Sequence, residues 1–286
     1  MNGVKTALLL GLLSGLLLLG GEWIGGRTGL EYAVAIAVFM NFFSYFFSDK
    51  LALAMYRAQA VTPQDNPEIY GRVYPIVNGL AQRMSIPMPK LWLIPEYSPN
   101  AFATGRDPNH ASVAFTQGIL QLMNDREIEG VVAHELGHVL HRDILISSVA
   151  ATIATAITFI ARMAFWFGPR GRDDDERGSA VGGLLMLIVA PIAAMLIQMA
   201  ISRTREYSAD AASVKYTGSP DGLISALRKL ENGVARVPMT DASPSTAHLF
   251  ILNPFGRGGM MKLFSTHPST EDRIARLEQM RYAPIR

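Results

Sequence analysis

The 286-residue chain has no cysteine. This absence excludes disulfide bridges, thiolate metal sites and cysteine nucleophiles, so any bound metal must be held by histidine and carboxylate side chains. Charge is also scarce, because 17% of the residues are charged and 49% are hydrophobic, and soluble domains of this size usually carry more charge. The formal net charge of +2 gives no sign of a broad nucleic-acid-binding surface. The apolar residues are unevenly distributed, which points to membrane spans.

Four long apolar segments stand out, at positions 6–24, 32–47, 144–167 and 180–202. A helix that crosses a bilayer needs about 20 apolar residues, so these lengths favour four transmembrane helices. Two alternatives remain open. The first segment follows Lys5 and could be a signal peptide, although no A-x-A-like cleavage site follows it. The last two segments could instead form a buried helical hairpin of a soluble protein.

These spans would divide the chain into two membrane hairpins and two soluble parts. We expect hairpins in residues 1–50 and 144–202, and the two parts of one soluble domain in residues 51–143 and 203–286. Lys and Arg residues near the span ends favour one side by six to four, which is a weak bias. The bias predicts a multi-pass membrane protein whose termini and soluble parts face the cytoplasm.

The most specific motif is HELGH at residues 134–138. We expect a helix over residues 127–142, with Asn124 and Glu127 forming a capping box at its start. Gly137, inside the motif, would let another segment of the chain approach this helix closely.

The spacing of this motif suits zinc-dependent hydrolysis. Residues four apart share one face of a helix, so His134 and His138 can bind one metal ion. Glu135 is then placed to reach the water that the metal activates. The alternative is a solvated helix face with two histidines, but the pattern H-E-x-x-H rarely arises by chance in a chain of this composition.

A catalytic zinc site usually has three protein ligands and one open position. The residues that compete for third place are His141, His248, His267 and Glu206. His141 lies only three residues after His138, and one straight helix rarely supplies three ligands to a tetrahedral ion.

Topology favours Glu206 as the third ligand. The third span begins soon after His138 and the fourth ends just before Glu206, so an even number of crossings brings the two residues back to the same side. Asp210 lies four residues further on and can accept the outer ring proton of a ligating histidine. The alternative for both acids is a surface face that pairs with Arg203 and Arg205.

The combination of HELGH, a two-span hairpin and EYSAD at residues 206–210 resembles the HtpX family of membrane zinc proteases. The CAAX prenyl proteases and OMA-type proteases are more distantly similar. PNAFATG at residues 99–105 and THPSTEDRI at residues 266–274 are also similar to motifs of the HtpX family, and the resemblance covers essentially the full length. It implies a mainly α fold, with four transmembrane helices and a cytoplasmic zincin-like α+β protease domain that has a small edge sheet.

The resemblance also implies a function. It suggests a zinc endopeptidase of the bacterial inner membrane that cleaves misfolded or damaged membrane proteins under stress and can cleave itself. One zinc per chain would be bound by His134, His138 and Glu206, and would lower the pKa of a water and polarise the scissile carbonyl. Glu135 would take the proton from water and deliver it to the leaving amine.

Further residues receive roles by motif matching. The oxyanion needs a donor beyond zinc, for which His267 is the first candidate and Arg203 the second. Asn100 would bind substrate backbone beside an edge strand at residues 110–115, as β-strand addition requires. His267 could also be an ordinary loop histidine, and Asn100 an ordinary turn residue after Pro99.

Two other functions remain open. One is zinc-dependent hydrolysis of a small amide or lipid by the same residues, and the other is a multispan scaffold or transporter with a structural zinc. The expected partners are polypeptides and the lipid bilayer, without nucleic acid. The sequence does not indicate an oligomeric state.

Overall fold

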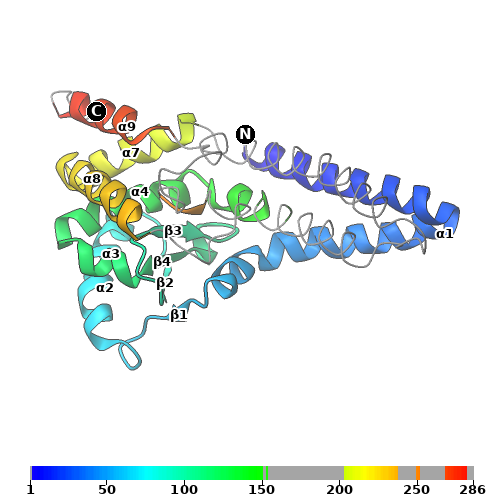
Figure 1. The fold of residues 1–286 in the computed structure, drawn as a ribbon, viewed down its shortest axis with the longest axis horizontal. Coiled ribbons are helices and arrows are strands. Elements are labelled where there is room, and N and C mark those ends of the chain that lie inside the picture. The colour runs from blue at the N-terminus through cyan, green and yellow to red at the C-terminus, as the bar shows by residue number, and fades with distance from the viewer. Residues whose placement is uncertain (1, 151–152, 154–202, 238–248, 252–267, 282–286) are drawn as a thin grey trace, which may run out of the picture.

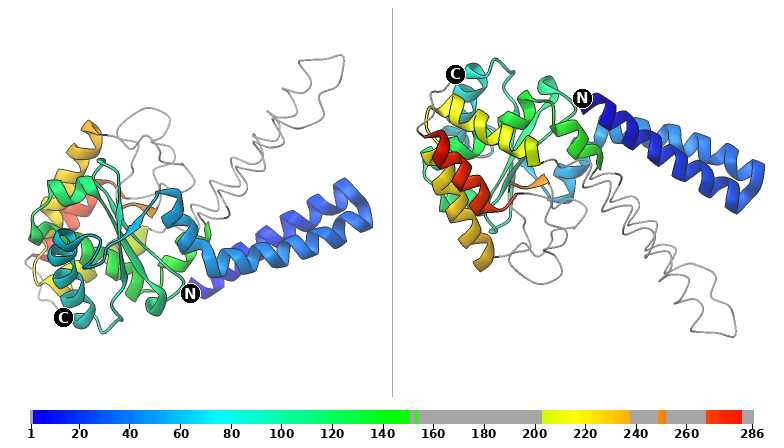
Figure 2. Two further views of the ribbon diagram at one scale, coloured as in Figure 1. Left: turned by 90° about the horizontal axis from the view of Figure 1, so that it is seen from below. Right: turned by 90° about the horizontal axis from the view of Figure 1, so that it is seen from above.

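The first helix, α1 (Asn2–Met55), turns back on itself at Gly26, whose φ of 55° and ψ of −138° interrupt the helical geometry. The computed structural model describes residues 2–150, 153, 203–237, 249–251 and 268–281. Figures 1 and 2 show the two halves of α1 side by side, and Asn41 Nδ2 donates a hydrogen bond to Ser14 Oγ across them at 2.8 Å. Glycine adopts this positive φ without a Cβ penalty, which allows the sharp turn.

The expected segments 6–24 and 32–47 fall in the two halves of this helix, and their role as a transmembrane hairpin stays a prediction. By length and hydropathy, one segment among the described residues qualifies as a membrane span: Gly26–Met55, with a mean hydropathy of 1.5.

The second hairpin is described only at its start. Residues 144–150 are helical, and Ile146, Val149 and Ala150 pack against Leu10, Leu17 and Met40 of α1. The remainder of the expected span 144–167, apart from Ile153, and the whole of 180–202 lie outside the described residues. The four-span layout and the proposed domain boundaries therefore stay predictions.

In the described part of the chain, four short strands form one mixed sheet in the order β1-β2-β4-β3. The strands are β1 (Gln59–Ala60), β2 (Lys90–Ile94), β3 (Ala101–Thr104) and β4 (Ser112–Thr116), with a short 3-10 helix, η1 (Pro108–His110), before β4. β2 and β4 run parallel, while β1 pairs antiparallel with β2 and β3 antiparallel with β4.

The strand expected at residues 110–115 exists as β4, but its expected position at the sheet edge is wrong. β4 lies between β2 and β3, and all five of its residues are buried. The edge strand next to β4 is β3, a run of mostly small and apolar residues that is buried on both faces. A strand buried on both faces lacks the alternation of polar and apolar residues by which sequence patterns identify strands.

The described residues after β1 include six longer helices, and the one that packs against most of the others, α4, carries HELGH. They are α2 (Pro67–Arg83), α3 (Gln117–Leu122), α4 (Asp125–Leu140), α7 (Arg203–Thr217), α8 (Asp221–Arg236) and α9 (Thr270–Met280). The predicted capping box starts α4: Glu127 N–H donates to Asn124 Oδ1 at 3.0 Å, and Asn124 N–H donates to Glu127 Oε2 at 2.9 Å. The helix ends at Leu140, two residues before its expected end.

Glycines on α4 allow α7 and α8 to pack directly on its backbone. A Cβ added at Gly137 would lie 3.1 Å from Ala209 Cα of α7, and one added at Gly130 would lie 2.6 Å from Leu223 N of α8. The close approach expected at Gly137 is therefore confirmed. It brings the start of α7 against the HELGH turns of α4.

Candidate active site

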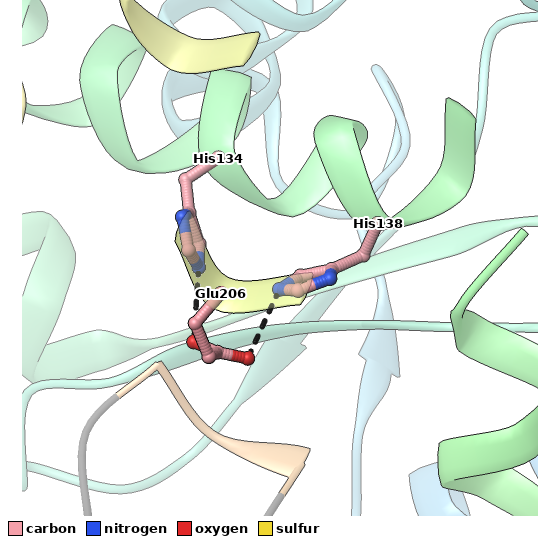
Figure 3. Close-up of side chains that lie close together, drawn as sticks. All are labelled: His134, His138 and Glu206. Carbon is pink, nitrogen blue, oxygen red and sulfur yellow. Dashed lines mark ion pairs between the residues drawn. The ribbon is translucent and has the colours of Figure 1, made fainter. Parts of the chain in front are cut away.

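Three potential metal ligands converge between α4 and α7, as Figure 3 shows. His134 and His138 come from successive turns of α4, and Glu206 comes from the first turn of α7. His134 Nε2 lies 3.8 Å from Glu206 Oε2, and His138 Nε2 lies 3.5 Å from Glu206 Oε1. One ligand atom from each residue fits within a group whose members are all within 4.8 Å of one another.

Each imidazole meets a second carboxylate on its other ring nitrogen. His134 Nδ1 lies 2.9 Å from Asp210 Oδ1, and His138 Nδ1 lies 3.3 Å from Asp143 Oδ2. A carboxylate at Nδ1 holds the proton on that nitrogen and leaves the lone pair of Nε2 available for a metal. Both rings therefore present Nε2 toward Glu206.

Arg273 of α9 is a residue that the sequence patterns did not single out. Its side chain is 2% exposed and forms a two-pronged pair with Asp210, Nη2 to Oδ1 at 2.6 Å and Nε to Oδ2 at 3.0 Å. A buried guanidinium requires such a partner because an unpaired charge is costly to desolvate. It lies six residues after His267 in the family-like segment 266–274, which was the one signal available from the sequence.

Glu135 lies on the side of α4 that faces the sheet. It is 3% exposed, and its Oε2 accepts a hydrogen bond from Ala103 N–H of β3 at 2.9 Å. Burial raises the pKa of Glu135 to about 7, although the positive charge at His138 and the bond from Ala103 favour the charged form. A carboxylate with a pKa near neutrality is suited to both accept and return a proton.

The two histidines have opposite electrostatic surroundings. Burial lowers the pKa of His134 to about 4, and the positive charge of Arg273 adds to this effect against the opposing influence of Asp210. Burial also acts to lower the pKa of His138, but the hydrogen bond to Asp143 and the charge of Glu206 outweigh it and raise the pKa to about 9.

The other residues proposed from the sequence lie apart from this cluster or outside the described residues. Arg203 is exposed at the start of α7, and the competing ligand His141 is exposed at the end of α4. His248 and His267 lie outside the described residues. Among the described residues, Asp210 pairs with Arg273, so the alternative of an exposed ion-pair face with Arg203 does not hold for this acid.

Asn100 precedes the edge strand and is fully buried. Its backbone N–H donates to Thr116 Oγ1 at 2.8 Å, and its side-chain Oδ1 accepts from Ala101 N–H at 3.2 Å. It therefore shapes the start of β3, the strand that contacts Glu135.

The family follows from a comparison with known proteins. Residues 68–281, which include every member of the cluster, match the model of Peptidase family M48. The chain belongs to peptidase family M48. This M48 chain is 52% identical over 282 residues to a "Protease HtpX homolog" of Desulfatibacillum aliphaticivorans, covering 96% of this chain and 89% of that protein. It is 51% identical over 288 residues to a "Protease HtpX homolog" of Sulfurihydrogenibium sp. (strain YO3AOP1), covering 98% and 96%.

A solved structure shares the fold. The crystal structure of S. mikatae Ste24p matches with a TM-score of 0.51 and 17% sequence identity, covering 97% of this chain. The match spans 65% of the Ste24p chain. The resemblance to the HtpX proteases is thus confirmed, and the chain is an HtpX-type M48 metalloprotease that shares its fold with Ste24p.

The donor set fits the metal that this family implies. Two imidazole nitrogens and one carboxylate oxygen are suited to zinc, whose tetrahedral ligand atoms lie roughly 3.4 Å apart at ordinary bond lengths. The separations of 3.5 and 3.8 Å from Glu206 to the two rings are close to this requirement. The geometry of the described residues therefore agrees with Glu206 as the third metal ligand.

Proposed function

We propose that this chain is a membrane-integrated zinc endopeptidase that cleaves misfolded or damaged membrane proteins at the cytoplasmic face of the bacterial inner membrane. The observation that supports it most is the convergence of His134, His138 and Glu206 in one cluster with Glu135 beside it. In this proposal the protein acts in stress-linked quality control and is capable of cleaving itself. The apolar half of α1, Gly26–Met55, would anchor the domain in the bilayer.

His134, His138 and Glu206 would hold one zinc per chain. When bound there, zinc would supply a Lewis acid that polarises the scissile carbonyl and makes a water acidic enough to attack it. Both histidines must be neutral to bind, and the carboxylates at their Nδ1 atoms would keep them in the required tautomer and orientation.

Glu135 would act as the proton carrier. Its side chain comes from the residue after His134, so it lies beside the place where water would be activated. In its charged form it would accept the proton of the attacking water, and it would then deliver that proton to the departing amine. In this structure Ala103 N–H donates a hydrogen bond to one of its oxygens.

Asp210 and Asp143 would position the ligating rings. Asp210 is itself fixed by Arg273, so α4, α7 and α9 all contribute to the orientation of His134. Asp143 would do the same for His138 with a longer contact. Such partners of metal ligands raise metal affinity by fixing ring orientation and basicity.

The oxyanion donor and the substrate-binding residues remain proposals. We propose His267 as the first donor, since the segment that follows it carries Arg273 into the cluster. The second candidate donor is Arg203, which lies about one turn before Glu206 on α7. Asn100 would contribute to substrate binding through the edge strand that it starts.

The proposal is tested with wild type and Glu135→Gln purified in detergent and supplied with zinc. Cleavage of an unfolded membrane protein is followed on gels, and zinc content is measured by atomic absorption. The expected result is one zinc per chain in both proteins, with cleavage by wild type and its loss, by about 1,000-fold or more, in the variant. Equal cleavage by both proteins would contradict the mechanism. A zinc-loaded wild type that cleaves small amides but no polypeptide would favour the small-molecule hydrolase.

A further inference from the structure

The backbone of the edge strand β3 has two sets of polar groups. Asn100 C=O accepts from Thr116 N–H at 3.0 Å, so alternate residues starting from Asn100 bond to β4. The N–H and C=O groups of Ala101 and Ala103 consequently point outward, away from the sheet. These outward groups are the ones that an added peptide strand would use.

Three of these outward groups already have partners within the chain. Ala101 N–H donates to Asn100 Oδ1 at 3.2 Å, and Ala103 N–H donates to Glu135 Oε2 at 2.9 Å. Ala101 C=O accepts from Ile251 N–H at 3.1 Å. The edge beside Glu135 is thus closed to another strand in this conformation.

The segment that bonds to Ala101 is held from both sides. Residues 249–251 are buried, and the C=O of Ile251 accepts from Arg273 Nη1 at 3.2 Å. The ring of Phe250 packs edge-on against Phe102 of β3, with centroids 5.2 Å apart, and against Tyr56, with centroids 5.0 Å apart. The segment therefore donates an N–H to the edge strand, offers a C=O to a guanidinium and places an aromatic side chain among buried residues. A protease site would hold a bound peptide by contacts of the same kinds.

The same contacts place this segment next to the proposed chemistry. Ala101 is two residues from Ala103, which bonds to Glu135, and Arg273 also bonds to Asp210 behind His134. A peptide bond presented to Glu135 from the edge of β3 would therefore have to occupy the space in which residues 249–251 lie.

We propose that residues 249–251 are an intramolecular occupant of the substrate-binding edge, so that the protease rests in a self-blocked conformation. This inference rests on the proposed peptidase function. A substrate backbone binds β3 after Ile251 leaves Ala101 C=O and Glu135 releases Ala103 N–H, and that release frees the carboxylate for proton transfer. Phe250 contacts Tyr56, the residue that directly follows α1, so the blocking segment also touches the base of the membrane hairpin.

The absence of cysteine permits a direct test by a reversible crosslink. The double variant Ala101→Cys/Ile251→Cys places two thiols at hydrogen-bonded backbone positions, whose Cα atoms normally lie within the roughly 4.4–6.8 Å that a disulfide spans. After oxidation in detergent with zinc present, crosslinking is verified by mass spectrometry and cleavage of a fluorescent peptide is measured. We expect cleavage to fall at least about tenfold and to recover on reduction with dithiothreitol, while each single variant is unchanged by oxidation. Full activity of the crosslinked protein would overturn the proposal.

A second pair of variants opens the block without a crosslink. Ile251→Pro removes the N–H that bonds to Ala101, and Ile251→Ala is its matched control because it shortens the side chain but keeps the donor. We expect Ile251→Pro to lower KM about fivefold relative to Ile251→Ala, which is the effect of losing one ordinary hydrogen bond from the closed state. An unchanged or higher KM, with melting temperatures that agree between the two variants, would contradict the proposal.

A binding experiment separates failure of this inference from failure of the peptidase function. In the background of Glu135→Gln, the thiol of Ile251→Cys is labelled with a maleimide before and after addition of an unfolded peptide whose binding is followed by fluorescence anisotropy. Ile251 is 2% exposed, so bound peptide should raise the labelling rate roughly tenfold by displacing the segment. A constant rate with bound peptide overturns the blocking role whatever the activity. If labelling rises but no variant cleaves any polypeptide, the peptidase function is the part that fails.

Discussion

The surroundings of His134 and His138 differ, although both residues lie on one face of α4. His134 is 1% exposed and faces Asp210, whose charge is balanced by Arg273. The side chain of His138 is 17% exposed and faces two carboxylates, Asp143 and Glu206. We call His134, Asp210 and Arg273 the inner half of the site, which is charge-balanced and built into the core. We call His138, Asp143 and Glu206 the outer half, which carries an excess of negative charge that attracts a proton or a metal cation.

The difference separates two tasks. The inner half depends on long-range packing, since α9 must dock before Asp210 is neutralised. The outer half takes His138 and Asp143 from α4 and the residues just after it and Glu206 from α7, and it tunes the affinity for cations. Changes in the inner half should therefore affect folding and metal binding together, and changes in the outer half should affect mainly metal binding and its pH dependence.

The largest effect is expected for Arg273→Met, which removes the cation from the inner half. Asp210 would stay buried with its charge uncompensated, at a cost of about 3–5 kcal/mol in the free energy of unfolding. Arg281→Met is the matched control at the end of the same helix, because Arg281 pairs with Asp221 at the surface and such pairs contribute about 0–1 kcal/mol. Thermal and denaturant unfolding in detergent would measure both. Equal destabilisation by the two substitutions would contradict the charge-balanced inner half.

Zinc affinity should depend on pH through the outer half. The pKa of His138 is raised to about 9 without metal, so at pH 7 a zinc ion must displace one proton from it. The apparent Kd for zinc should therefore fall about tenfold per pH unit between pH 7 and 9, and become constant above. The pKa of His134 is lowered to about 4, so this ring is already neutral and adds no dependence in the same range.

Competition with a chelator of known pH dependence would measure this slope. In Asp143→Asn the hydrogen bond that raises the pKa of His138 is weakened, so the plateau should begin at a lower pH. A zinc affinity that does not change between pH 7 and 9 would be inconsistent with the negative outer half.

Replacing the two positioning acids should affect zinc binding unequally. Asp210→Asn should weaken zinc binding by about 10–100-fold, because it loosens the orientation of His134 and also disturbs Arg273. Asp143→Asn should weaken it less, by roughly threefold to tenfold, since its contact to His138 is 3.3 Å and more exposed to water. Isothermal titration at one pH compares the two, and a larger loss in Asp143→Asn would reverse the comparison.

A smaller effect is expected where α4 and α7 touch. Gly137→Ala places a Cβ 3.1 Å from both Ala209 Cα and Ala212 Cβ, so α7 must shift and carry Glu206 with it. We expect a loss of about 1 kcal/mol in stability and a weaker zinc affinity. Gly79→Ala on α2 meets no atom within 4 Å and should be neutral or stabilise by up to about 1 kcal/mol, as measured by thermal unfolding. The same response from both variants would show that the α4–α7 contact does not limit the site.

The sequence predicted the part of the site that depends on local periodicity and chain topology. His134, Glu135 and His138 follow from the helical repeat, and the capping residues that begin α4 could also be predicted from the sequence. Glu206 and Asp210 followed from the need for the chain to return to one side of the membrane, and the geometry brings both to His134.

The parts that escaped prediction depend on tertiary packing. Arg273 has no local pattern that distinguishes it from a surface arginine of α9, and only its docking against Asp210 makes it central. β3 was missed because strands buried on both faces do not alternate, and β4 was therefore taken for an edge strand, although it lies between β2 and β3. The contact of Ile251 with Ala101 joins residues 150 positions apart, for which no periodicity gives a signal.

The measurement that tests the central claim most directly is the X-ray absorption spectrum of the zinc-loaded protein in detergent, compared with Glu206→Ala. The account predicts one zinc per chain with two imidazole ligands at about 2.0 Å and a carboxylate oxygen, and loss of that oxygen together with weaker binding in the variant. Full zinc occupancy with an unchanged ligand shell in Glu206→Ala would contradict the assignment of the metal centre to the junction of α4 and α7.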